Sequence, residues 1–395
     1  MSRSFPPPPI IPFERLQASD GLLITAERWQ RSHHYHRQRQ NVHYQSLNQP
    51  GIVCGLGVRP IEAPTEVSAA YRDKFWLRVQ PGIAIDLSGN LIVVPKPIAF
   101  RIATELKSSD PVTVYLVVRY RDPDELRDQK PNEFVQETFR IDEKSSPPDG
   151  SDVELCRILL QIDKKEITTP KDVFFPGFGD LDLRYRRQAQ ARPQGLLRIA
   201  QINHADSSCS QNFFSLSYFV QAIEALYPAL RSVETIDTID WSNDLHAYDL
   251  LYLTGQESIT LNAREFKKLE TYLRSGGTVL IDAATEATAL IESVQELAQK
   301  LKMPLKSLDQ NRRDHPLRTR PFLFAALPQT NKQRIQLLSH DGLILSIGNL
   351  ASIWGLDEAL ELSRTTIRTA QELGVNILHY AWKRRHLTEL QKDDR

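Results

Sequence analysis

Side chains that could support nucleophilic chemistry lie in one loop of the C-terminal half of the chain. His204, Asp206 and Cys209 follow an apolar segment, residues 196–202, which has the pattern of a buried β-strand. A cysteine becomes a nucleophile when a base such as histidine lies within hydrogen-bond reach, so this pair is the minimum for thiol chemistry. The preferred interpretation is a structural loop, with thiol chemistry as the alternative.

Carboxylates offer a second possibility, which is acid–base or metal chemistry. Asp282 and Glu286 are four positions apart, and Asp249 begins another predicted strand, so the three could form a cluster for a divalent cation. Acidic residues also favour helix N-termini through the helix dipole, and capping is the interpretation we prefer. His315, within Asp-His-Pro-Leu, is expected to be a turn histidine, with ligand orientation as the alternative. We therefore assign no residue a catalytic role from the sequence, and we expect no bound metal.

These side chains would be positioned by a parallel sheet. Residues 249–253 and 278–281 are short apolar runs, and a helical pattern between them ends at Gly276-Gly277. A strand–helix–strand unit implies a parallel sheet covered by helices, with sites beyond the carboxyl ends of its strands. Strands and helices alternate over residues 195–385, which predicts an α/β three-layer domain. Near its end, a helix over 356–373 is expected to stop before Gly374.

A helix with heptad spacing is predicted near the N-terminus. It should begin at Thr25, a plausible N-cap with Glu27 in the first turn, and continue to about Leu47. Steps of four and three place a set of residues on one face: Leu22, Ala26, Trp29, His33, His36, Gln40, His43 and Leu47. We expect Trp29, His33, His36, Gln40 and His43 to form a half-buried assembly face. A metal site is the alternative, but no carboxylate or cysteine shares the face with His33 and His36.

The residues after this helix predict a small antiparallel β sandwich or barrel. Short strands recur at roughly ten-residue spacing over residues 51–121, and Ser88-Gly89-Asn90 is typical of a hairpin turn. In the first strand, alternation places Cys54 on the same side as Ile52 and Leu56, where its thiol would be buried and inert. The whole chain is therefore expected to be an α+β multidomain protein.

Changes in composition along the chain predict its organisation. We expect five segments: a Pro-rich arm over 1–17, a helix-plus-β assembly module over 18–172, a linker with a basic run over 173–194, the α/β domain over 195–385 and a charged tail over 386–395.

Composition excludes several classes of protein. The chain has 49 Lys and Arg against 49 Asp and Glu, and this balance argues against a dedicated nucleic-acid binder. Three scattered cysteines predict neither a zinc ribbon nor a disulfide framework, so a reducing compartment is expected. The N-terminus lacks the pattern of a signal peptide, and no apolar run predicts a transmembrane helix. Neither a P-loop nor a complete dinucleotide fingerprint occurs, so no cofactor is expected.

Three segments of the N-terminal half resemble a module found beside phage-tail-like and contractile-injection-system genes. They read LQASDGLLITAERWQRSHHYHRQRQ, GIVCGLGV and RVQPGIAIDLSGNLIVVP, and cover some 80 residues of the region 16–172. The resemblance implies a structural part at or near a contractile baseplate, within a multiprotein particle.

The C-terminal half resembles an uncharacterised prokaryotic family related to the glutamine-amidotransferase-like, flavodoxin-like fold. The resemblance rests on YDLLYLTG, YLRSGGTVLID, DHPL and SRTTIRTAQELGVNILHYAW. Active amidotransferases present a nucleophilic cysteine in a tight turn after a strand. In this chain the corresponding turn, after residues 278–281, holds Asp282-Ala283-Ala284 and no thiol.

Together these observations predict a non-enzymatic structural component of a phage-tail-like contractile injection system. It would lie in the cytoplasm as part of the assembled particle, where it would contact other subunits or a second copy of itself. A degenerate amidotransferase-like domain would serve for protein contact. The alternative is a hydrolase or amidotransferase-like enzyme acting through the strand-end loops, with His204, Cys209, Asp282 and His315 as candidates.

Overall fold

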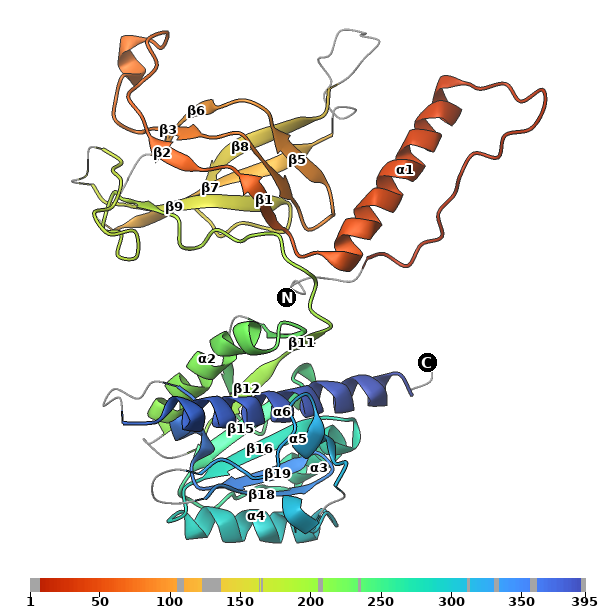
Figure 1. Ribbon diagram of the computed structural model, residues 1–395, viewed down its shortest axis with the longest axis vertical. Helices are drawn as coiled ribbons and strands as arrows, with labels where there is room; N and C mark the ends of the chain where they lie inside the picture. Colours follow the sequence, from red (N-terminus) through yellow and green to blue (C-terminus); the bar gives the residue numbers. More distant parts are fainter. Residues whose placement is uncertain are drawn as a thin grey trace. The chain divides into compact units, whose positions relative to one another are not determined.

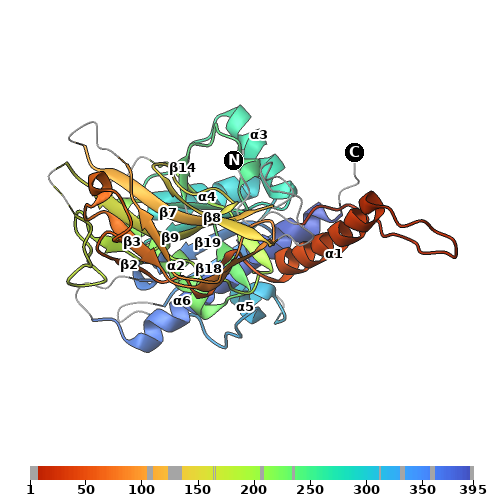
Figure 2. The ribbon, with the colours of Figure 1, turned by 90° about the horizontal axis from the view of Figure 1, so that it is seen from above.

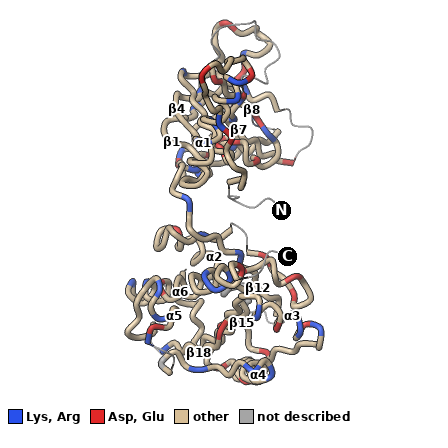
Figure 3. The backbone as a smooth tube through the Cα atoms, turned by 90° about the vertical axis from the view of Figure 1, so that its right-hand side faces the viewer, with Lys and Arg blue, Asp and Glu red and all other residues tan. Residues whose placement is uncertain are grey.

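The computed structural model describes most of the chain, as two compact units, Met1–Arg192 and Pro193–Arg395 (Figure 1). The described residues are 8–104, 110–122, 136–162, 164, 166–204, 209–233, 236–310, 313–329, 334–355 and 361–391, without the side chains of 209–213 and 309. The α+β multidomain class is confirmed. Acidic and basic residues are interspersed over both units, in keeping with the balanced composition (Figure 3).

The predicted N-terminal helix is α1, Ala26–Leu47. Thr25 is its N-cap, because the side chain accepts a hydrogen bond from the backbone N–H of Arg28. None of its 22 residues is buried. Seen from above, α1 extends away from the strands of its own unit, and the preceding arm continues beyond it (Figure 2).

The strands of the first unit form three small antiparallel sheets. Their orders are β1-β4-β5, β2-β3-β6 and β10-β9-β7-β8, and no described sheet closes into a barrel. The strands are β1 Gly51–Gly55, β2 Val58–Pro60, β3 Trp76–Val79, β4 Gly82–Ile85, β5 Leu91–Val94, β6 Ile98–Arg101, β7 Val112–Arg121, β8 Thr138–Lys144, β9 Asp152–Leu160 and β10 Leu181–Asp182, with a short 3-10 helix η1, Ala69–Tyr71. Inward side chains of all three sheets, such as Ile52, Leu77 and Leu116, share one core.

The expectation that Cys54 is buried is wrong. The register of β1 against β4 shifts between Ile52 and Cys54, so one residue of β1 is extra. Such a bulge interrupts the alternation of side chains, and Cys54 is exposed while Ile52 stays in the core. Cys156 in β9 is buried, and burial raises the pKa of its thiol.

Residues 173–192, within the segment expected as a linker, pack against the first unit. β10 pairs with β9, and the Arg186 guanidinium donates to the carbonyls of Gly55, Leu56 and Leu155. Arg192 holds the end of α1: its N–H donates to the Leu47 carbonyl at 2.8 Å, and its guanidinium donates to that of Gln45 at 2.7 Å. Both arginines therefore hold the backbone of the first unit.

A seven-stranded, mainly parallel sheet organises the second unit. Its order is β14-β12-β15-β16-β19-β18-β17, and only the β18 and β17 end is antiparallel. The strands are β12 Ile199–Ile202, β14 Asp237–Ile239, β15 Leu250–Gly255, β16 Thr278–Ala283, β17 Lys306–Ser307, β18 Gln336–His340 and β19 Leu343–Ile347, and a separate parallel pair joins β11 Gly195–Leu197 to β13 Leu230–Ser232.

Helices cover both faces of this sheet, as the three-layer prediction requires. They are α2 Cys209–Leu226, α3 Ala263–Arg274, α4 Thr288–Lys300, α5 Pro316–Thr319 and α6 Arg364–Glu389, with 3-10 helices η3 Leu245–Ala247, η4 Leu308–Gln310 and η5 Leu350–Ile353. Leu250 and Tyr252 of β15 pack in the core with α2 and α6, whereas Leu251 and Leu253 pack with α3 and α4. Because both faces are buried, β15 is apolar throughout rather than alternating.

The strand–helix–strand unit predicted over 248–284 is confirmed as β15, α3 and β16. Asn262 and Glu265 form a capping box at the start of α3, and Gly276, at a φ of 93°, follows its end.

The predicted break at Gly374 is wrong, because α6 runs through it as one helix. A side chain at this position would collide with Phe219 of α2: a Cβ on Gly374 would lie 2.4 Å from the ring. The glycine thus permits close helix packing. Residues 356–360 of the predicted helix lie outside the described part of the chain, and α6 extends into the residues expected as a tail.

Candidate functional site

Asp282, the leading carboxylate candidate, is fully buried at the end of β16. Its Oδ1 accepts the N–H of Leu350 and its Oδ2 accepts the N–H of Ala351, both at 2.8 Å, and the Tyr252 hydroxyl lies 3.4 Å away. Burial raises the pKa of this carboxyl to about 6, against the opposing effect of the two backbone N–H groups. The side chain therefore caps η5 from the neighbouring strand.

The last residue of β16 is hydrogen-bonded to the loop that follows β19. Ala283 is buried, and its carbonyl accepts hydrogen bonds from the N–H groups of Gly348 and Asn349 at 2.8 and 3.0 Å. Asn349 adopts a φ of 56°, a left-handed conformation that turns the chain into η5. The end of β16, where a nucleophile was considered from the sequence, is thus hydrogen-bonded to the loop after β19.

The carboxylate cluster considered from the sequence is not formed. Asp249 precedes β15, where its side chain accepts from the N–H of Arg198 at 2.8 Å and its carbonyl accepts from Thr278 at the start of β16. It therefore lies at the amino ends of the strands, whereas Asp282 lies at the carboxyl end and Glu286 is exposed. Within the described ranges, no three His, Cys, Asp or Glu side chains are grouped as a metal site requires.

His204 is placed at the carboxyl ends of the strands, as predicted for its loop. Its Nε2 lies 2.8 Å from the carbonyl of Glu257, and its ring occupies the space beside Gly255, where a Cβ would approach to 2.8 Å. The histidine joins the loops after β12 and β15. Asp206 and the side chain of Cys209 lie outside the described residues, so the thiol–histidine pair stays a prediction.

His315 is the N-cap of the short helix α5. Its Nδ1 accepts from the N–H of Leu317 at 3.3 Å, and its ring stacks on Tyr380 of α6 at 5.8 Å. Burial lowers the pKa of the His315 imidazole. Tyr380 in turn donates to the carbonyl of Asp341, in the turn before β19. His315 thus belongs to the amino-end side of the sheet, away from His204 and Asp282.

The five residues predicted as an assembly face are all exposed on α1: Trp29, His33, His36, Gln40 and His43. Trp29, 54% exposed, meets His33 edge-on at 5.2 Å. An adjacent side of α1 contacts its own unit through polar groups: Arg37 pairs with Asp122 at 2.8 Å, and Asn41 hydrogen-bonds Asn90. Within the described part of the chain, all five side chains of the predicted face are exposed.

An apolar arm lies beside α1, a feature that the proline content does not reveal. Ile10 is fully exposed and Ile11 is 68% exposed, while Phe13 meets Tyr35 of α1 edge-on at 6.4 Å. The Arg28 guanidinium donates to the carbonyl of Leu23 and holds the turn between arm and helix. The arm therefore contacts α1 at Tyr35, whereas Trp29 and His43 are exposed.

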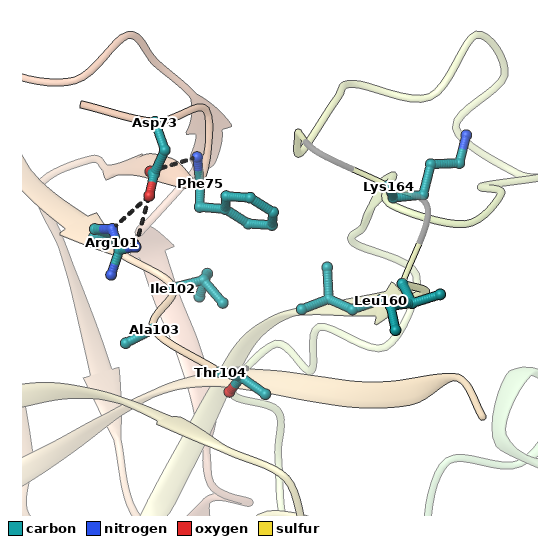
Figure 4. A pocket seen from close by; sticks show the side chains of 9 residues that line it. Asp73, Phe75, Arg101, Ile102, Ala103, Thr104, Leu160 and Lys164 are labelled. Carbon is teal, nitrogen blue, oxygen red and sulfur yellow. Dashed lines mark hydrogen bonds and ion pairs between the residues drawn. The ribbon is translucent and has the colours of Figure 1, made fainter. Parts of the chain in front are cut away.

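Two further surface features of the first unit escaped the sequence prediction. A cavity of about 420 Å³ lies between the ends of β6 and β9 and is lined by Asp73, Phe75, Arg101, Ile102, Ala103, Thr104, Leu160, Ile162 and Lys164 (Figure 4). Its charged pair is already satisfied, since Arg101 binds Asp73 at 2.6 Å. Nearby in sequence to β10, Phe174 and Phe175 are 69% and 79% exposed.

Comparison with known proteins adds little to this geometry. Residues 198–382 match a family described only as a domain of unknown function, DUF4159. A ThuA-like protein from Bacteroides uniformis is 13% identical, with 48% of this chain and 91% of that chain covered and a TM-score of 0.29. A baseplate complex from the type VI secretion system is 14% identical, with 55% and 69% covered and a TM-score of 0.24. No curated protein matches. Similarity at this level carries no argument about function.

Over the residues that the structure describes, no helix combines the length and the apolar character needed to cross a bilayer.

Proposed function

We propose that this chain is a non-enzymatic structural component of a phage-tail-like contractile injection system, at or around its baseplate and within the cytoplasm. The observation that carries the proposal is the exposure of α1. Its 22 residues include no buried side chain, and a tryptophan with three histidines faces outward at heptad spacing.

A helix of this kind needs a packing partner. Isolated helices are marginal in water, and most helical stability in proteins comes from packing of one face. α1 rests on its own unit through side-chain hydrogen bonds and one ion pair, with neither side buried. Docking of the outward face on another subunit would supply the missing packing, which agrees with the module that the N-terminal sequence resembles.

The second unit supports a contact role rather than catalysis. The Asp282 carboxylate, at the end of the central strand β16, accepts the N–H groups at the start of η5. The carbonyl of Ala283 beside it is hydrogen-bonded to the loop after β19. Covalent catalysis requires a nucleophile held beside a base, and His204 at this edge contacts the backbone carbonyl of Glu257. The hydrolase alternative therefore receives no specific support from the described residues.

Purification of the native particle, followed by mass spectrometry of its parts, tests the proposal. The chain is expected as a stoichiometric component. A chain carrying Trp29→Ser with His36→Ser is expected to fold and to be missing from the particle, whereas the exposed control Leu387→Ser in α6 is incorporated. Absence of the unmodified chain from purified particles would sink the proposal.

A further inference from the structure

We infer that α1 docks against an acidic, amphipathic α-helix of a different protein, an inference that rests on the proposed function for its setting. The evidence is the charge of α1. The helix contains one acidic residue, Glu27, and from position 28 to position 47 it contains none. Over the same stretch it carries four arginines and four histidines: Arg28, Arg31, Arg37 and Arg39, and His33, His34, His36 and His43.

Among the described residues, two of the four arginines of α1 pair with an acidic side chain and the other two make different contacts. Arg37 pairs with Asp122, and Arg31 pairs with Glu27 at 3.6 Å in a pair that is 65% and 83% exposed. Arg28 donates to a backbone carbonyl, and Arg39 lies over the Tyr35 ring. Neither of these contacts neutralises a charge. Because the chain as a whole is neutral, this concentration of cations on one projecting helix is local.

The outward face has the pattern of one strand of a coiled coil. Trp29, His36 and His43 recur every seven residues, with His33, Gln40 and Leu47 between and after them. Residues at this spacing insert into a facing helix, and charges on the flanking positions select the partner. Arg39 flanks the face directly. A helix of 22 residues is about 33 Å long, so the partner segment should offer roughly six turns.

Charge complementarity also discriminates between occupants. A second copy of α1 would set arginine against arginine, which is unfavourable. A nucleic acid would satisfy the arginines but not Trp29 and Leu47, each 54% exposed, on the same face. A helix with apolar core positions and glutamates beside them satisfies both requirements.

The test uses the purified full-length chain and two designed 22-residue probe peptides with identical leucine core positions. One peptide carries glutamate at the flanking positions and the other carries lysine; a DNA duplex is the third probe. Fluorescence anisotropy should show saturable binding of the glutamate peptide, weakening as salt is raised, and at least about tenfold weaker binding of the lysine peptide.

A charge-reversed variant sharpens the test. Arg28→Glu with Arg39→Glu should lower the affinity for the glutamate peptide about tenfold and invert the preference toward the lysine peptide. Arg37 and Arg31 are left unchanged because they pair with Asp122 and Glu27. Arg264→Glu, at an exposed position of α3, is the matched control and should behave as the unmodified chain. Circular dichroism verifies that α1 is retained.

Three outcomes would overturn the inference: no binding of the glutamate peptide, equal binding of both peptides, or preference for the DNA duplex. Since the assay contains no particle, its failure leaves the proposed function to be decided by particle composition. Conversely, a chain that binds the glutamate peptide but is absent from particles would disprove only the proposed function.

Discussion

Asp282 at the end of β16 binds the N–H of Leu350 at 2.8 Å, although 68 positions separate the two residues. The bond joins the centre of the sheet to the turn that precedes α6. Both residues are buried, so no water replaces the bond when it is lost.

Removal of this carboxylate should destabilise the second unit. Asp282→Ala leaves the N–H groups of Leu350 and Ala351 without acceptors, at an expected cost of about 2–4 kcal/mol in the free energy of unfolding. Asp282→Asn retains one acceptor and should cost less. Urea unfolding measures both, with exposed Glu286→Ala as the control. A cost below about 1 kcal/mol for Asp282→Ala would contradict the capping role.

The same residue makes a specific contribution to pH dependence. Burial raises its pKa to about 6 in the folded state, above the ordinary value of about 3.9 for an aspartate, so the folded state holds the proton more tightly than the unfolded state. The contribution of Asp282 to stability is therefore present at acid pH and declines as pH rises from about 4 through about 6, by about 3 kcal/mol in total. Other groups also titrate in this pH range. The measurement is therefore the difference in the free energy of unfolding between the unmodified chain and Asp282→Asn at each pH. A difference that does not vary with pH would refute this assignment.

Gly374 should tolerate no larger residue. Gly374→Ala improves helix propensity, but its Cβ would lie 2.4 Å from the Phe219 ring, and overpacking of this kind costs about 1–3 kcal/mol. Pairing the change with Phe219→Leu should recover part of the loss, which a double-mutant cycle measures. Additive losses would show that the ring and the glycine are not coupled.

The outward face of α1 should contribute nothing to the stability of the free chain. Trp29→Ser and His36→Ser remove exposed side chains, so each should change the free energy of unfolding by less than about 0.5 kcal/mol. The thermal unfolding transition of the first unit measures this change in stability. A larger loss would mean that the face is already packed within the chain.

The two described cysteines should differ sharply in reactivity. In a Cys209→Ser background, a thiol reagent should modify exposed Cys54 in the native protein and reach buried Cys156 only after unfolding. Burial, which raises the pKa of the Cys156 thiol, acts in the same direction. The control is Cys54→Ser in the same background, which should not react in the native state. Modification of that native variant would show that Cys156 is accessible and would contradict the prediction.

Local patterns in the sequence were sufficient for the elements whose signals are short-range. The Thr25 cap, the helix end at Gly276 and the apolar runs of β15 and β16 depend on neighbours within a few positions. Such signals do not depend on the rest of the fold, so they were recognised.

Long-range contacts account for what was missed. Gly374 looked like a helix end because its partner, Phe219, lies 155 positions earlier in sequence, and the bulge that exposes Cys54 depends on the facing strand β4. Likewise, the sequence placed Asp282 at a strand end but could not identify the turn that it caps. The exposure of α1 was also beyond prediction, since the heptad pattern is the same for a packed and an unpacked face.

The contacts of Arg186 and Arg192 determine where the first unit can be cut for expression on its own. A chain ended at residue 172, before the basic run, would lose the guanidinium that serves the carbonyls of Gly55, Leu56 and Leu155. It would also lose both donors to the last turn of α1. A fragment ending at Arg192 keeps all of these hydrogen bonds. It is therefore the fragment from which a folded first unit that retains α1 can be prepared.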